Sequence, residues 1–252
     1  MRAPTASPPR RRAGLINAAL LTLVAVAVLL GLGTWQIERK FWKEALIERL
    51  ERRLAAPPVE LPTPASWAGL DAAQDEFRRV AFRARFTPGQ EALVYTSGSA
   101  FRADVSGPGY WVFAPANIAG GGVVVVNRGF VPQGMREHPG RAQDGTAALD
   151  IVGVLRWPEA RGLFMPSDEP DKNLWFVRDP VAIAAAKGWG AVAPFFVEQE
   201  APAPPDGWPR PGPLKVNLRN EHLPYALIWY GLALALVVVF AVWARAALRN
   251  VG

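Results

Sequence analysis

The residue of greatest chemical interest is His222, which precedes an apolar run in the segment Asn220-Glu-His-Leu-Pro-Tyr-Ala-Leu-Ile-Trp-Tyr-Gly231. Tyr225 and Trp229 follow at spacings that place aromatic surface near the imidazole if the segment is helical. Pro224 suits the first turn of that helix, which leaves His222 just outside it. A neutral imidazole beside aromatic side chains can serve as an axial ligand of a haem iron. The alternative is that His222 caps a helix or bonds to lipid headgroups, while the aromatic side chains form an interfacial belt.

The sequence offers few other groups for catalysis. His138 and His222 are the only histidines and form no metal-ligand pair, and the absence of cysteine excludes disulfides, thiolate metal sites and cysteine nucleophiles. No dinucleotide-binding loop, phosphate-binding loop or serine-nucleophile elbow is present. Asp168, Glu169 and Asp171 lie in a polar, proline-bounded loop that is typical of solvated surface. We therefore expect a protein that is not an enzyme and has no catalytic residues.

Two uncharged apolar runs, Leu15–Thr34 and Leu223–Trp243, stand near opposite ends of the chain. At about 1.5 Å of rise per residue, a helix of roughly twenty residues is about 30 Å long, which matches the hydrocarbon core of a bilayer. We therefore predict transmembrane helices at residues 15–35 and 223–244. Trp35 would then lie at the same outer boundary as His222, and the two side chains are predicted to line one pocket.

Each run has an alternative interpretation. Buried helices of a soluble core would normally show a polar face, which neither run has. The first run could also be a cleaved signal peptide, since Gly31-Leu-Gly33 is a small-x-small triplet behind an apolar run. Its length exceeds the usual apolar region of about 7 to 15 residues, however, and it continues into a helical pattern. An uncleaved anchor is therefore favoured.

Charge predicts the orientation of the chain. The two tails hold no acidic residue and six arginines that equal the formal net charge of +6, namely Arg2, Arg10, Arg11, Arg12, Arg245 and Arg249. Short positive tails stay on the cytoplasmic side, so residues 1–14 and 245–252 are predicted to be cytoplasmic tails. The sequence pI of about 10.0 then reflects membrane-flanking tails rather than a nucleic-acid-binding surface.

Between the two runs the pattern changes from helix to strand. Residues 36–56 are predicted to form a juxtamembrane amphipathic helix, residues 57–200 a β-rich extracytoplasmic domain and residues 201–222 a proline-rich connector. Strands are expected at residues 80–86, 91–96, 110–114, 123–127, 149–157, 174–177 and 195–198, and a short helix at residues 180–187. The predicted fold class is an α+β membrane protein. Two terminal transmembrane helices would flank a mainly antiparallel β domain of sandwich or barrel-like form.

Five motifs occur in order along the chain: Gly33-Thr-Trp-Gln-Ile-Glu-Arg-Lys-Phe-Trp-Lys-Glu-Ala-Leu-Ile47, Phe77-Arg-Arg-Val80, Gly109-Tyr-Trp-Val-Phe-Ala-Pro115, Val126-Asn-Arg-Gly-Phe-Val-Pro132 and His222-Leu-Pro-Tyr-Ala-Leu-Ile-Trp-Tyr230. Together they resemble the Surfeit locus protein one family over nearly the whole chain. The resemblance implies an assembly factor for cytochrome c oxidase in the bacterial inner membrane, with a periplasmic main domain. It also implies haem a as a transient cofactor. The implied partners are oxidase subunit I, membrane lipid and, as a further candidate, haem a synthase, with no nucleic acid.

The same resemblance assigns residues. The family's C-terminal histidine falls on His222, as an axial ligand of haem iron, and its Trp-Gln pair falls on Trp35 and Gln36. The predicted cofactor-binding residues are His222, Trp35, Tyr225, Trp229 and Arg128.

The family's Asn-Arg-Gly turn falls on Asn127, Arg128 and Gly129. The planar fork of Arg128 suits a haem propionate, and the alternative is a structural salt bridge within the domain. Gly129 is expected to need a positive φ.

The function expected from these features is non-catalytic. The protein would hold haem a at the outer membrane boundary and assist its delivery into subunit I. One alternative is a haem-independent membrane scaffold that stabilises an oxidase assembly intermediate. The other is an extracytoplasmic enzyme, which would require a cluster of convergent carboxylates.

Overall fold

The structure is a computed structural model that describes residues 8–136 and 147–249. Arg2, His138 and parts of both predicted tails lie outside the described residues. The chain forms two compact units, a helical unit of Met1–Ile47 with Arg219–Gly252 and a strand-rich unit of Glu48–Leu218. The helices are α1 (Pro8–Ala55), α2 (Ala72–Asp75), α3 (Pro180–Lys187) and α4 (His222–Arg249). The strands are β1 (Val59–Glu60), β2 (Arg79–Phe86), β3 (Ala92–Gly98), β4 (Ser106–Ile118), β5 (Val123–Pro132), β6 (Leu149–Arg156), β7 (Leu174–Trp175) and β8 (Phe196–Ala201).

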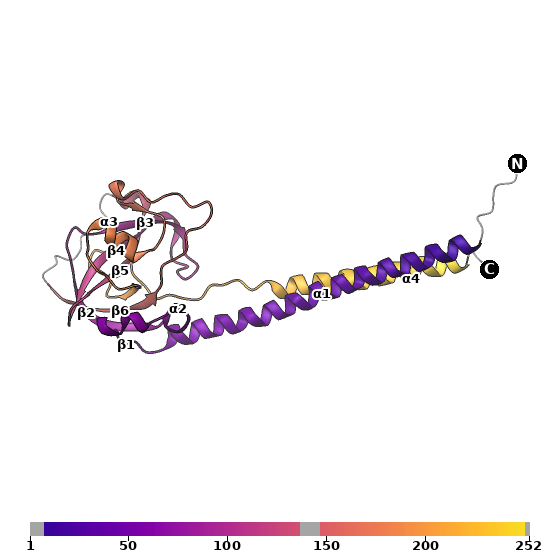
Figure 1. Cartoon of the computed structure of the whole chain (residues 1–252), viewed down its shortest axis with the longest axis horizontal. Coiled ribbons are helices and arrows are strands. Elements are labelled where there is room, and N and C mark those ends of the chain that lie inside the picture. The colour runs from indigo at the N-terminus through magenta and orange to yellow at the C-terminus, as the bar shows by residue number, and fades with distance from the viewer. Residues whose placement is uncertain (1–7, 137–146, 250–252) are drawn as a thin grey trace. The chain divides into compact units, whose positions relative to one another are not determined.

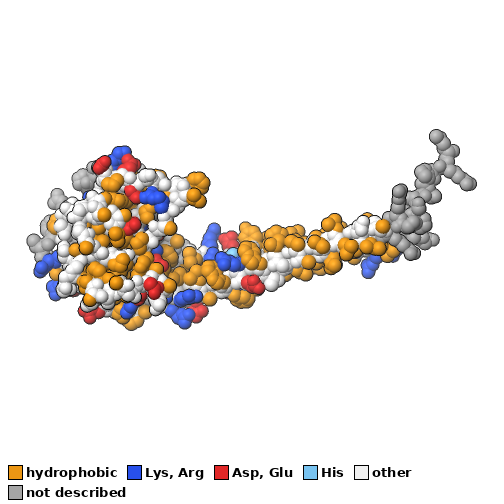
Figure 2. Space-filling model, in the orientation of Figure 1, with side chains coloured by type: hydrophobic (Ala, Val, Ile, Leu, Met, Phe, Trp, Pro, Cys, Tyr) orange, Lys and Arg blue, Asp and Glu red, His pale blue; other side chains and the backbone are white. Residues whose placement is uncertain are grey.

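The helical unit consists of α1 and α4, which run side by side in opposite directions (Figure 1). Both helices are long and apolar enough to cross a membrane, judged by length and composition. Almost none of their residues is buried, and Figure 2 shows apolar side chains along their surface, whereas a core helix of a soluble protein would bury its apolar side chains. The soluble-core alternative is therefore disfavoured.

The helices approach each other closely at Gly33, which is buried. A Cβ atom at this position would lie 2.6 Å from the ring of Tyr230, so only glycine fits without movement. A Cβ atom at Gly31 or Gly231 would meet open space, so neither of these glycines forms the contact. Close packing of this kind is how helices associate in lipid, where no hydrophobic effect drives them together.

α1 continues without a break to Ala55, as the amphipathic pattern predicted. It ends just before Pro57 and Pro58, which cannot continue a helix because they lack a backbone N–H. Two i,i+4 ion pairs lie on this part of the helix, with Lys40 Nζ 2.8 Å from Glu44 and Arg52 Nε 4.0 Å from Glu48.

The strand-rich unit is built on one mixed sheet in the order β1-β2-β6-β8-β5-β4-β3-β7, and β2 also pairs with β4. The seven predicted strands correspond to β2–β8, and the predicted short helix corresponds to α3. Five of the strand pairings are antiparallel, as expected, but β1–β2, β3–β7 and β5–β8 are parallel. The sheet is mixed and mostly antiparallel, and because β2 pairs with both β6 and β4, the strands β2-β6-β8-β5-β4 are joined in a ring; the sandwich or barrel-like form of the domain stays a prediction. β5 and β8 can be parallel because the chain passes through β6, β7 and α3 between them.

Both faces of the central strand β5 are buried. Val124 and Val126 belong to a core cluster with Phe195, whereas Val125 belongs to a second cluster with Phe113. A strand that is covered on both faces reads as a continuous apolar run, which is why residues 123–126 are all valine.

The proline-rich segment after β8 packs back on the sheet at Gly129. This glycine has a φ of +128°, as expected, and a Cβ atom there would lie 2.3 Å from the carbonyl of Arg210. Backbone hydrogen bonds join Phe130 and Arg210 in both directions. Buried Arg102 holds the same segment, because its guanidinium donates to the carbonyl of Gly212 at 3.3 Å.

Candidate functional site

His222 is joined to the other helix of the helical unit by a hydrogen bond. Its Nδ1 atom lies 2.7 Å from Oε1 of Gln36 on α1. An amide oxygen only accepts hydrogen bonds, so Nδ1 carries the proton and donates it. The lone pair of the imidazole is then on Nε2, to which no described residue donates or accepts a hydrogen bond. An imidazole whose other nitrogen is held in this way has the arrangement of a metal ligand.

Further contacts join α1 to α4 and to the residues just before α4, close to this hydrogen bond. The hydroxyl of Thr34 donates to the carbonyl of Leu30, so the hydroxyl of Tyr230 donates to Thr34 over 3.2 Å. Asn220 donates its side-chain amide to the carbonyl of Lys40 at 3.4 Å. Together with Gly33, these contacts hold His222 against Gln36.

The start of α4 differs slightly from the prediction. The helix begins at His222, so the histidine is its first residue rather than lying outside it. Pro224 still fits, because the first four N–H groups of a helix have no partner within the helix.

The three predicted aromatic residues differ in the direction of their side chains relative to this histidine and in their exposure. Tyr225 and Trp229 lie three and seven positions after His222 on α4, which places them on its side of the helix. Tyr225 is 52% exposed and Trp229 is half-buried. Trp35 is also 52% exposed, but its side chain leaves α1 about 100° round the helix from that of Gln36. The structure joins Gln36 to the imidazole by a hydrogen bond, and the place of Trp35 in a shared pocket stays a prediction.

Arg128 lies inside the strand-rich unit and is only 4% exposed. Its guanidinium stacks over the ring of Phe86 at 4.7 Å, and Nε and Nη1 have no hydrogen-bond partner among the described residues. The alternative of an internal salt bridge is not borne out, since no carboxylate of a described residue lies within 4.0 Å. Burial lowers the pKa of Arg128 below its usual range, although Glu91 and Asp206 oppose that change.

The carboxylates of the loop after β6 serve the structure. Asp168 accepts a hydrogen bond from the backbone N–H of Phe176 at 2.7 Å and pairs with Arg161. Glu169 pairs with Lys172. No group of three or more acidic or histidine residues that could hold a metal occurs in the described part of the chain. The pairing of Asp168 and Glu169 with basic residues of the same loop gives both carboxylates a structural role.

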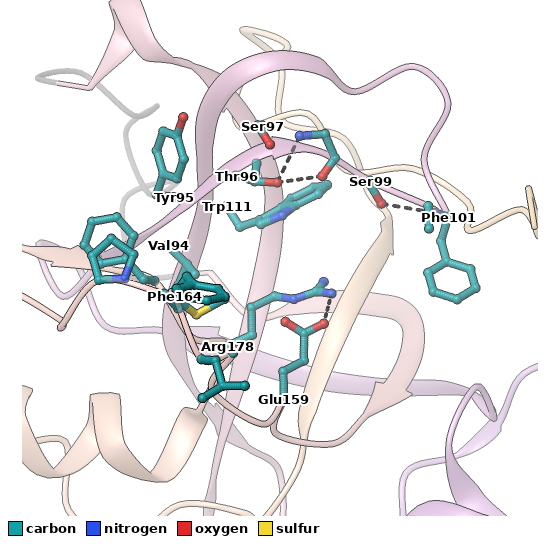
Figure 3. Close-up of a pocket in the computed structure, with 17 residues that line it drawn as sticks. Val94, Tyr95, Thr96, Ser97, Ser99, Phe101, Trp111, Glu159, Phe164 and Arg178 are labelled. Carbon is teal, nitrogen blue, oxygen red and sulfur yellow. Dashed lines mark hydrogen bonds and ion pairs between the residues drawn. The ribbon is translucent and has the colours of Figure 1, made fainter.

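The strand-rich unit contains one further hollow of interest, a groove of about 730 Å³ (Figure 3). Val94–Phe101 line one wall, and Gly162–Pro166 line the other. Glu159 and Arg178 form an ion pair in it. Burial disfavours the charged form of each, but Glu198 and Glu159 hold the pKa of Arg178 above its ordinary value. The hydrogen bond from Arg178 and its charge lower the pKa of Glu159.

Comparison with known proteins identifies the family. A model of the SURF1 family matches residues 23–234. The chain belongs to the SURF1 family. Surfeit locus protein 1 of Rattus norvegicus is 35% identical over 222 residues, which cover 83% of this chain and 70% of that protein. The human protein of the same name is 35% identical over 230 residues, covering 86% and 73%. A SURF1-like protein of Monosiga brevicollis is 35% identical over 243 residues, covering 92% and 88%.

The SURF1 match includes both partners of the hydrogen bond between the helices, Gln36 and His222. The resemblance in sequence pointed to Gln36 through the Trp-Gln pair, but the residue types alone did not. The role of a single glutamine in an apolar helix cannot be inferred from its residue type until the residue that it contacts is known. The candidate site of this chain is thus the imidazole of His222, which is hydrogen-bonded to Gln36 of the other apolar helix.

Proposed function

We propose that this protein is an assembly factor for cytochrome c oxidase that holds haem a as cargo and passes it to oxidase subunit I. The observation that carries the proposal is the 2.7 Å hydrogen bond between Nδ1 of His222 and Oε1 of Gln36. It leaves Nε2 as the free lone pair that an iron ligand needs. Membership of the SURF1 family supports the assembly role.

The proposed setting is the bacterial inner membrane. α1 and α4 cross it, both termini are cytoplasmic, and the strand-rich domain lies in the periplasm. The apolar surfaces of the helices and the arginines of the tails support this topology. His222 and Gln36 then lie at the outer end of the two spans, where the side chains of Tyr225 and Trp229 offer aromatic surface to a flat, apolar macrocycle.

The residues of this chain would bind and orient the cargo and not change it chemically. Haem a supplies an iron that accepts a nitrogen ligand, and Nε2 of His222 is presented for it. Gln36 keeps the imidazole in one tautomer and one orientation. A single histidine on an open helix surface gives moderate affinity, which suits a carrier, because a partner with more ligands can then take the cargo. Subunit I is the proposed acceptor and haem a synthase a proposed donor.

The test is a visible absorption spectrum of the full chain purified from cells that make haem a. We expect a Soret band in the wild type and its loss in His222→Ala. His138→Ala is the matched control, because it removes the chain's only other histidine, and it should keep the band. An equal band in His222→Ala would overturn the role of His222, and no band in the wild type would favour the haem-independent scaffold.

Topology is tested separately, because the natural chain has no cysteine. Ser106→Cys in the domain should react with an impermeant maleimide in intact spheroplasts, whereas Ala246→Cys near the end of α4 should react only after permeabilisation. The reverse pattern would contradict the proposed orientation.

A further inference from the structure

One edge of the sheet is left without a partner strand over part of its length. β3 pairs with β4 from Ala92 to Gly98, but β7 pairs only with Leu93 and Val94. From Tyr95 onward, the side of β3 away from β4 has no strand beside it in the described part of the chain. Alternate residues of a strand direct their N–H and C=O groups to opposite sides, so the outward groups at Tyr95–Ser97 are free to accept another strand. The N–H and C=O of Gly98 are occupied, because both bond to the hydroxyl of Thr96.

The groove of Figure 3 runs along this free edge. Eight consecutive residues, Val94–Phe101, line it, so the strand edge is one wall. Trp111 and Phe176 add aromatic surface, and the opposite wall is the loop of Gly162–Pro166. A row of backbone hydrogen-bonding groups faced by apolar side chains is what a protein uses to bind an extended peptide as an added strand.

Two apolar side chains of the opposite wall are almost fully exposed to solvent. Leu163 is 98% exposed and Phe164 is 99% exposed, far more than any other large apolar side chain described in the strand-rich unit. Hydrophobic side chains also stand on a projection of this unit in Figure 2. Two adjacent large apolar side chains held fully in solvent beside a groove are typical of a binding surface.

The charged residues near the groove indicate one further property of a segment that would bind there. Arg178 pairs with Glu159 and lies 3.5 Å from Glu198, and Arg156 lies 3.4 Å from Glu198 and 3.2 Å from Glu76. Three carboxylates thus face two guanidinium groups, and Glu159, the carboxylate that lines the groove, is 42% exposed. The excess of negative charge favours a basic side chain in whatever binds there.

We propose that this groove binds an extended, largely apolar segment of a partner protein that carries one basic side chain, and that the segment adds as a strand to β3. Its backbone pairs with the free edge at Tyr95–Ser97. Its apolar side chains pack between Trp111 and the Leu163–Phe164 wall, and its basic group meets Glu159. This docking role goes beyond the proposed cargo role and does not depend on His222.

The test uses the full chain in lipid nanodiscs and a displayed library of random octapeptides. Selected peptides should alternate apolar residues and include Lys or Arg. The double variant Leu163→Ser/Phe164→Ser should bind them at least about tenfold more weakly. Both replaced side chains are almost fully exposed, so the fold is kept. The matched control is Val181→Ser on α3, which changes another exposed apolar residue (49%) outside the groove and should bind normally.

A second measurement isolates the backbone contribution. A selected peptide that is N-methylated at alternate residues keeps its side chains but cannot pair with a strand edge, so it should also bind at least about tenfold more weakly. Equal binding of the methylated peptide, or a selection without peptides that depend on Leu163 and Phe164, would overturn the proposal. Self-association of the wild type that the double variant abolishes would assign the groove to a second copy of the chain and would also overturn it.

Discussion

At the scale of single residues, the hydrogen bond between Gln36 and His222 is the feature on which the proposed function rests. Gln36→Leu keeps the approximate size of the side chain but removes the acceptor for Nδ1. Loss of such a partner of a metal-binding histidine typically lowers affinity about 10- to 100-fold. We therefore expect the haem a content of the purified Gln36→Leu variant to fall strongly, measured by pyridine haemochrome absorbance per mole of protein.

The control for this prediction is Gln74→Leu, the same change at an exposed glutamine of the strand-rich unit. It should leave the haem a content unchanged. Normal haem a content in Gln36→Leu would show that the amide does not position the imidazole.

Because of the ion pair between Glu159 and Arg178, we expect the free energy of unfolding to depend on pH. The pKa of Glu159 lies below its ordinary value of 4.5 in the folded protein, so the pair stabilises the fold above that pH and loses its effect as the pH falls through the lowered pKa. Glu159→Gln should therefore lower the free energy of unfolding near neutral pH and approach the wild type in strong acid. Because the carboxylate is 42% exposed and Arg178 keeps Glu198, we expect a loss of only about 0.5 kcal/mol.

Urea unfolding of the domain in the full chain, followed by tryptophan fluorescence at several pH values, measures this difference. Asp150→Asn serves as the control, since Asp150 lies 3.9 Å from Arg83 at an open surface. A loss for Glu159→Gln that is the same at every pH would contradict the ion-pair explanation.

At the scale of elements, the packing of α1 on α4 depends on Gly33. Gly33→Ala places a methyl group against the ring of Tyr230, whose hydroxyl is held by Thr34, so the ring cannot simply turn away. Overpacking of this kind costs about 1–3 kcal/mol. We expect several-fold less crosslinking of Lys40→Cys with Asn220→Cys by a short bis-maleimide, whereas Gly31→Ala, which meets open space, should crosslink as before. Equal yields in both variants would mean that the helices are held together elsewhere.

The close approach at Gly129 makes the second prediction at this scale. Alanine there would need a φ of +128° and would meet the backbone of Arg210 at 2.3 Å. We expect Gly129→Ala to destabilise the domain by about 3 kcal/mol or more. Gly134→Ala, at a glycine with open space around it, should change stability little. Similar urea midpoints for the two variants would contradict the structural role of the proline-rich segment.

Local patterns predicted most helices and strands, because the periodicity of apolar residues and the residue types of turns can be recognised in short stretches of sequence. The alternation of apolar and charged residues in 80–86 predicted β2, and the short helix predicted at residues 180–187 is α3, whose first turn the carboxylate of Asp179 caps in the structure. The pairing of β3 with β7 and of β5 with β8 was not predicted, because register between distant strands leaves no local pattern. The short strand β1 was missed because its neighbouring prolines indicated an extended connector.

The candidate site was likewise predicted only in part from the sequence. His222 stood out because histidine is rare in this chain, but its bond to Gln36 joins residues 186 positions apart and required the structure. Sequence placed Trp35 beside the histidine by depth alone, since the direction of a side chain around a helix depends on where the partner helix packs. No local pattern singled out Leu163 and Phe164, and only the structure shows that their side chains lie in solvent.

At the scale of the whole molecule, the two units have separate proposed roles. The apolar helices would hold the cargo through His222, and the groove of the strand-rich unit would bind a partner segment. The two roles can be separated experimentally, since His222→Ala should leave peptide binding intact and the Leu163→Ser/Phe164→Ser variant should keep haem a.

The proposed delivery of haem a can be measured as the haem a content per oxidase subunit I in membranes of cells that lack this protein, with and without a restored copy. We predict that subunit I is made but contains several-fold less haem a in the deletion strain, that the wild type restores it and that His222→Ala does not. Full haem a content in the deletion strain would contradict the account.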